Sequence, residues 1–223
     1  MVIIEEDKPL PEHTKLCYEE CYAKLLLETF IEKFKNINIQ DKPDLVCDAC
    51  HTGVEVTDVM DKNKKEALKL WYTMPYVPAD KQKYNKERMQ KLGMPYQGGV
   101  QSWPVISYDN GIDSAPYQEL YESLHKKLKK FNKGNYKLYE SNEILFFSEL
   151  WFAHDEECLI IERLNQIQNS YSNKFDVIYV VTQGYLYEFK LNSLGVRKFY
   201  IHGANSSLAE KARQMVIEAE KNA

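Results

Sequence analysis

The chain has 223 residues, of which 44% are hydrophobic and 28% carry a charge. These values are typical of a folded protein and exclude a disordered or collagen-like chain. With 29 basic and 33 acidic side chains the net charge is -4, so no overall positive charge draws the chain toward nucleic acid or an anionic membrane. Any such attraction must come from a local patch.

The length suits a single α/β domain over residues 1–223. No apolar run approaches the roughly 20 residues that cross a bilayer, and residues 1–10 are too acidic for a secretory signal. We therefore expect a cytoplasmic protein without a membrane partner. The cysteines are odd in number, which favours free thiols in a reducing compartment. They are Cys17, Cys21, Cys47, Cys50 and Cys158, and the Cys-x-x-Cys-His sequence at 47–51 leaves a structural zinc site as an alternative.

Hydrophobic spacing predicts the regular elements of the first third of the chain. Apolar side chains recur at helical intervals over residues 16–34, which predicts an amphipathic helix. Residues 44–47 and the β-branched residues 53–57 are typical of two strands joined by a short turn, so we expect a hairpin. A further helix is predicted over residues 64–72.

The remainder divides into an irregular stretch and a second set of elements. Prolines and glycines are frequent over residues 73–116, which predicts an insertion or extended loop without long regular elements. A helix follows over residues 116–131, and residues 117–223 as a whole complete the core. Their other predicted elements are a strand at 143–150, a helix at 156–170, a hairpin from 175–182 and 185–191, and a C-terminal helix from residue 206.

The residues best suited to chemistry are Pro43-Asp44 and, after ten intervening residues, Glu55-Val56-Thr57. Two carboxylates on neighbouring strands can share one Mg²⁺ ion, which prefers oxygen ligands and retains several waters. The Val56 carbonyl is a candidate third ligand. Glu55 lies between two valines in a strand, where a charge costs free energy unless it is paired or bound to a metal. The alternative is that Asp44 and Glu55 are edge charges or turn formers.

Four features follow one another along the chain: a helix with an acid, a strand that begins with Pro-Asp, a strand with Glu55-Val56-Thr57, and a second helix. This order resembles the PD-(D/E)xK nuclease superfamily. The resemblance covers residues 14–72. It implies a restriction-endonuclease-like mixed central sheet flanked by helices, and Mg²⁺- or Mn²⁺-dependent cleavage of DNA. By the resemblance Asp44 and Glu55 bind the metal, Glu20 is the helical acid, and Thr57 occupies the catalytic position of the motif lysine.

A threonine hydroxyl cannot position and polarise a water as an ammonium does. The nearest substitutes for the lysine are Lys62, Lys64 and Lys65, of which we take Lys64 as the candidate catalytic residue. The alternative is an inactive member of the same fold that binds nucleic acid or a protein partner. Such a protein is also compatible with a homodimer.

A basic run near the end of the helix at 116–131 is the candidate DNA-binding surface. Lysines can neutralise backbone phosphates, although a solvated helix face has the same composition. The run consists of Lys126, Lys127, Lys129 and Lys130.

Overall fold

The computed structural model describes residues 10, 13–60, 62–94, 112, 114–134, 136–148, 150, 152 and 156–221. The chain divides into two compact units. The first holds residues 13–59 and the chain from residue 110 onward, and the second includes residues 60–109. The two units are described separately.

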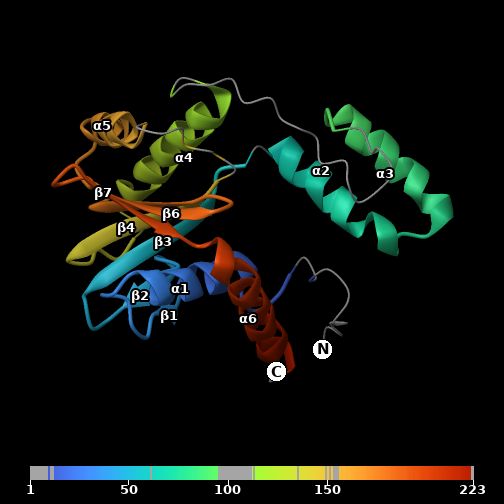
Figure 1. Cartoon of the computed structure of the whole chain (residues 1–223), viewed down its shortest axis with the longest axis horizontal. Coiled ribbons are helices and arrows are strands. Elements are labelled where there is room, and N and C mark those ends of the chain that lie inside the picture. The colour runs from blue at the N-terminus through green and yellow to red at the C-terminus, as the bar shows by residue number, and fades with distance from the viewer. Residues whose placement is uncertain are drawn as a thin grey trace. The chain divides into compact units, whose positions relative to one another are not determined.

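The first unit is an α/β structure, as the sequence predicts (Figure 1). Its central sheet has seven strands in the order β1-β2-β3-β4-β5-β6-β7. The strands are β1 (Asn38–Ile39), β2 (Leu45–Cys47), β3 (Thr52–Asp58), β4 (Ser141–Phe147), β5 (Val177–Val181), β6 (Tyr185–Lys190) and β7 (Gly195–Tyr200). The helices are α1 (Tyr18–Phe30), α4 (Ala115–Phe131), α5 (Glu157–Gln168) and α6 (His202–Lys221).

The sheet is mixed. β3, β4 and β5 run parallel to one another, and the strand pairs on either side of them are antiparallel. The predicted hairpin of residues 44–57 is confirmed, with Leu45 opposite Val54 and Cys47 opposite Thr52. The predicted hairpin of β5 and β6 is confirmed as well. The short strand β1 and the edge strand β7 were not predicted.

Helices cover both faces of the sheet (Figure 1). On one face the apolar stripe of α4 and the buried side of α5 pack against β4, β5 and β6, around residues such as Leu124, Phe146 and Ile178. On the other face α1 and α6 pack around residues such as Leu27 and Tyr179. Because side chains alternate along a strand, Val54 and Val56 point toward α1, and Glu55 between them points toward α4.

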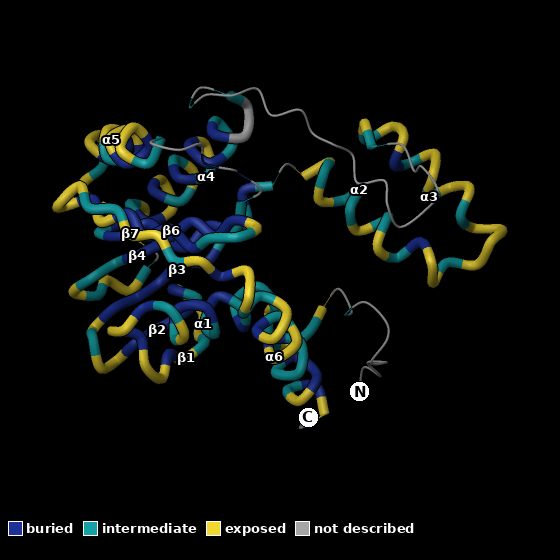
Figure 2. The backbone as a smooth tube through the Cα atoms, viewed as in Figure 1, coloured by how far each residue is buried: buried dark blue, intermediate teal, exposed yellow. Residues whose placement is uncertain are grey.

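The second unit holds α2 (Lys62–Thr73), the 3₁₀ turn η1 (Met74–Tyr76) and α3 (Ala79–Lys91). Most of its residues are exposed or half-buried, in contrast to the strands of the first unit (Figure 2). Its buried residues include Ala67, Met74 and Met89. A two-pronged ion pair joins the helices: Arg88 Nε donates to Glu66 Oε1 at 2.7 Å and Arg88 Nη2 to Glu66 Oε2 at 3.0 Å.

The helix α3 corrects the prediction that residues 73–116 lack long regular elements. The breakers are concentrated at its two ends, because Pro78 precedes the helix and Gly93, with φ +80°, follows it. No proline or glycine lies between residues 79 and 91, so this segment can hold a helix. Residues 95–111 lie outside the described part of the chain. None of the described helices combines the length and apolar character needed to cross a membrane.

Candidate acidic site

The acidic site lies where the pairing of β2 with β3 stops. β2 pairs only with the first part of β3, from Thr52 to Val54, whereas β3 continues to Asp58. Beyond that point the Asp44 side chain replaces a strand carbonyl as the hydrogen-bond acceptor, since its Oδ2 accepts a hydrogen bond from the Val56 amide at 2.7 Å. A carboxylate in this position satisfies a strand amide and remains close to the side chains of β3.

Glu55 is buried and points from β3 toward α4. Its Oε1 accepts hydrogen bonds from Lys127 Nζ at 2.6 Å and from the Tyr136 hydroxyl at 3.0 Å. Its Oε2 is also buried, and it has no hydrogen-bond partner within the described residues. Both donors therefore bind the same carboxylate oxygen, Oε1, and Oε2 remains available to a further donor or a cation.

Glu20 of α1 belongs to the same electrostatic neighbourhood. Burial, together with the charges of Asp44, Glu19 and Glu55, raises the pKa of Glu20 to about 7. Burial and the charge of Glu55 raise the pKa of Asp44 to about 6, against the lowering effects of the Val56 amide and Lys127. The negative charges of neighbouring acids therefore add to burial in raising the pKa values of Glu20 and Asp44.

The predicted site residues differ in their position relative to Glu55. Asp44 and Glu55 influence Glu20 electrostatically, and Glu55 influences Asp44, while the role of these three acids in metal binding stays a prediction. Thr57 lies two residues beyond Glu55 on the same strand face and pairs with Phe146 of β4. The third proposed ligand, the Val56 carbonyl, belongs to the residue whose amide Asp44 caps.

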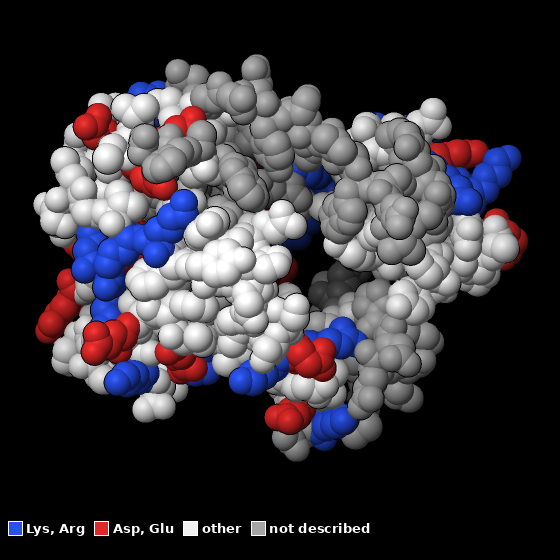
Figure 3. Space-filling model, viewed as in Figure 1, with Lys and Arg blue, Asp and Glu red and all other residues white. Residues whose placement is uncertain are grey.

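The remaining candidates are the lysines. Lys64 belongs to α2 in the second unit, and its role as the displaced lysine stays a prediction. Of the predicted DNA-binding residues, Lys126, Lys129 and Lys130 are exposed. Lys127 is not part of that surface, because its side chain is 18% exposed and turns to Glu55. Acidic and basic side chains are interspersed on the face drawn in Figure 3, in agreement with the small net charge.

Two residues of this site were missed by the sequence reasoning. Lys127 lies seven residues after Leu120 and four before Phe131, so helical periodicity already places it beside the apolar stripe of α4. A lysine in that position is expected to reach a buried acid. Tyr136 follows α4 in a segment without regular structure, and the sequence carries no signal for its contact with Glu55.

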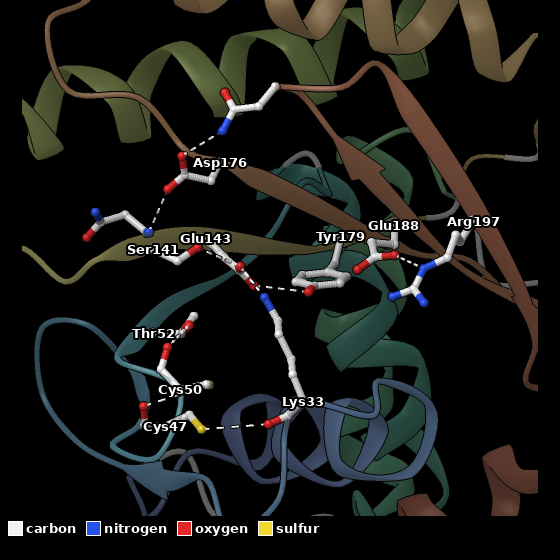
Figure 4. A network of polar contacts seen from close by, with 12 residues as sticks. Lys33, Cys47, Cys50, Thr52, Ser141, Glu143, Asp176, Tyr179, Glu188 and Arg197 are labelled. Carbon is white, nitrogen blue, oxygen red and sulfur yellow. Dashed lines mark hydrogen bonds and ion pairs between the residues drawn. The ribbon is translucent and has the colours of Figure 1, made fainter.

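A second polar network lies on the α1 face of the sheet (Figure 4). Glu143 of β4 is 1% exposed and accepts hydrogen bonds from Lys33, from the Ser141 hydroxyl at 2.8 Å and from the Tyr179 hydroxyl at 3.0 Å. Nearby, the equally buried Glu188 pairs with Arg197 of β7. Glu143 and Glu188 each have a cationic partner, so no further cation is needed to compensate their charges.

The described residues contain no group of three or more His, Cys, Asp or Glu side chains in an arrangement that could hold a metal ion. All five cysteines are free, and three of them are buried or half-buried: Cys21, Cys47 and Cys50. The zinc alternative therefore gains no support from the geometry. Comparisons of the chain with family models, with curated proteins and with solved structures give no match.

Proposed function

We propose that the chain is a metal-dependent nuclease that cleaves phosphodiester bonds in DNA, with Lys127 in the role of the motif lysine. The observation that carries the proposal is the contact of 2.6 Å between Lys127 Nζ and Glu55 Oε1, beside the Asp44 carboxylate. The resemblance leaves Thr57 where an ammonium is expected, and Lys127 supplies an ammonium to the same acid from α4.

The site has features that suit Mg²⁺ or Mn²⁺. Glu55 Oε2 is a buried oxygen without a hydrogen-bond partner among the described residues, and Asp44 contributes a second carboxylate. Mg²⁺ is commonly bound by one or two carboxylates, with waters and substrate phosphates as the other ligands, so a group of three protein ligands is not required. When bound, the ion would activate a water and neutralise charge on the phosphodiester.

The protein groups have distinct roles in this proposal. Asp44 and Glu55 hold the cation, and Glu20 adds a third carboxylate to the neighbourhood. Lys127 contacts Glu55 and presents an ammonium that orients the attacking water or a phosphate oxygen. Tyr136 fixes the orientation of the Glu55 carboxylate, since it donates to the same oxygen as Lys127.

The test is cleavage of labelled single-stranded and duplex DNA with Mg²⁺ or Mn²⁺ by four proteins. Wild type is expected to cleave, and Glu55→Gln and Lys127→Met are expected to lose at least about 100-fold in rate. The matched control is Lys126→Met on the same helix, since Lys126 is 72% exposed and its nearest acid is Glu122 at 3.6 Å. Equal rates for wild type and Glu55→Gln, or for Lys127→Met and Lys126→Met, would contradict the proposal.

A second candidate is an inactive protein of the same fold that binds a partner. The observation in its favour is that Lys127 and Tyr136 both donate to the same oxygen of Glu55, so protein groups alone satisfy that oxygen. This candidate predicts no Mg²⁺ or Mn²⁺ binding by isothermal titration calorimetry, together with DNA binding that Glu55→Gln does not alter. Divalent-ion binding that is lost in Glu55→Gln would exclude it.

A further inference from the structure

A pocket of about 430 Å³ opens between α1, α6 and the end of β4, outside the acidic site. Its size is within the range of small-molecule sites. All of its lining residues belong to the first unit. They are Tyr18, Glu19, Tyr22, Phe147, Asn205, Ser206 and Ala209.

The aromatic residues of this pocket form a stack. The rings of Tyr18 and Tyr22 are 6.1 Å apart with an angle of 11° between their planes, and those of Tyr22 and Phe147 are 5.7 Å apart at 16°. Both separations are typical of offset stacking. The Tyr22 ring is held from a third side, since its hydroxyl donates to Asn205 Oδ1 at 3.0 Å. A nearly parallel set of rings is suited to receive another flat ring.

Glu19 is the acid among the lining residues, which also include the polar side chains of Asn205 and Ser206. Glu19 lines the pocket, and its Oε2 accepts a hydrogen bond from the Cys17 thiol at 3.1 Å. A carboxylate has room for several donors, and the exocyclic amino groups of cytosine, adenine and guanine are suitable ones. The same carboxylate repels a phosphate, so a base fits this pocket better than a sugar-phosphate backbone does.

The pocket adjoins the proposed site on two elements. Glu19 directly precedes Glu20 on α1, and Phe147 pairs with Asp58, three residues beyond Glu55 on β3. At the rise of a strand this offset along β3 is about 10 Å. Phe147 packs with the cluster on the α1 face and Glu55 is turned to Lys127 of α4, so the acid on the same side of the sheet as the pocket is Glu20. A short single strand with one base in the pocket can therefore approach the acids from the side of Glu20. A paired base cannot enter, because its faces and its edge are occupied by the duplex.

We propose that the pocket of Tyr18, Tyr22 and Phe147 receives one unpaired, amino-bearing nucleobase, so that the substrate is single-stranded DNA or an unpaired DNA end. The inference rests on the proposed function, whose substrate class it narrows. Stacking supplies most of the binding, and Glu19 distinguishes amino-bearing bases from thymine.

The experiment measures binding without cleavage, in the presence of EDTA. The probe is a short single-stranded oligodeoxynucleotide with one 2-aminopurine, a fluorescent base that stacking quenches. Wild type is expected to quench the probe and to bind oligo-dC or oligo-dA more tightly than oligo-dT. Tyr18→Leu and Phe147→Leu are expected to weaken binding by about fivefold or more. The matched control is Tyr200→Leu, because Tyr200 is an exposed tyrosine of β7 outside this pocket.

Three results would overturn the inference. The first is that wild type and Tyr18→Leu bind the single strand with equal affinity. The others are tighter binding of duplex than of single-stranded DNA, and displacement of the probe by a lysine-rich peptide at a lower concentration than an unlabelled oligodeoxynucleotide requires. Thermal melting of each variant shows whether it is folded, and the half-buried Tyr18 tests the pocket even if Phe147→Leu is unstable.

The two proposals fail separately. Quenching that depends on Tyr18 without any metal-dependent cleavage would remove the nuclease and retain the base pocket as the site of a single-strand-binding protein. Cleavage that Tyr18→Leu leaves unchanged at every substrate concentration would remove the base pocket and retain the nuclease.

Discussion

Lys127 Nζ lies 2.6 Å from Glu55 Oε1, and the two side chains are only 18% and 8% exposed. Removal of one partner from a buried ion pair leaves an uncompensated charge. We expect Lys127→Met to lower the free energy of unfolding by about 3 kcal/mol, and the double variant with Glu55→Gln to recover part of that loss. Urea denaturation of the four proteins in a double-mutant cycle measures the coupling. Additive effects would show that the contact contributes nothing.

The raised pKa values of Glu20, about 7, and Asp44, about 6, predict how stability depends on pH. In the folded protein both acids hold protons that the unfolded chain has already released, so their contribution to stability is largest at low pH and is lost as pH rises from about 4 to about 7. Glu20→Gln is expected to flatten this fall at its upper end. Melting temperatures across this range test it, with the exposed Glu122→Gln as the control. An identical pH profile for Glu20→Gln and wild type would contradict the assignment.

The same acids make divalent-ion binding dependent on pH, because a carboxylate must be ionised to bind a metal. Mg²⁺ is therefore expected to raise the melting temperature above pH 7 and to have little effect below pH 6. Glu55→Gln is expected to lose the effect at every pH. Thermal shift at constant ionic strength, with Na⁺ as the matched salt, separates ion binding from screening. A Mg²⁺ effect that persists at low pH would point to a site elsewhere.

Gly53 lies in β3 where two side chains approach its backbone. A Cβ at this position would be 2.7 Å from Pro43 Cγ and 2.7 Å from Tyr139 Cδ2, and both rings are too rigid to move aside cheaply. Gly53→Ala is expected to destabilise the protein by about 1–3 kcal/mol, and to displace Pro43 next to Asp44. The control is Gly184→Ala, where a Cβ has no neighbour within 4 Å. Denaturant unfolding of both variants compares them, and equal stabilities would contradict the expectation.

The buried Glu143 depends on Lys33 for its charge compensation. Lys33→Met is expected to destabilise the protein by about 2–4 kcal/mol, and Tyr179→Phe by about 1 kcal/mol, because Tyr179 donates only a neutral hydrogen bond. Lys35→Met is the control, since Lys35 is an exposed lysine close by in sequence. Chemical denaturation orders the three variants. A Lys33→Met protein as stable as Lys35→Met would contradict a stabilising role for the contact between Lys33 and Glu143.

The sequence predicted the elements of the acidic site well, because periodicity and β-branched residues determine them locally. The hairpin that carries Asp44 and Glu55 and the helix that ends near Phe131 both occur as expected. α6 begins at His202, ahead of the predicted start at residue 206, and includes Gly203 in its first turn.

The long-range partners of the site could not be predicted in the same way. Lys127 was assigned to a basic surface because a run of lysines reads as one solvated face, although the helix turns one of them inward. Tyr136 reaches Glu55 from 81 residues away, and no local pattern marks such a contact. β7 was missed because buried and exposed residues alternate only weakly along Gly195–Tyr200, and because this edge strand pairs with β6 alone.

The parallel pairing of β3 with β4 joins segments that are separated by more than 80 residues. Asp44 and Glu55 therefore lie close together in sequence, on a local hairpin. Lys127 belongs to α4, which is synthesised only after the helices of the second unit. Contacts of such high sequence separation form late in folding. During synthesis the carboxylate of Glu55 consequently remains without its ammonium until the chain has passed residue 127, so the complete site can assemble only after more than half of the 223 residues have been translated.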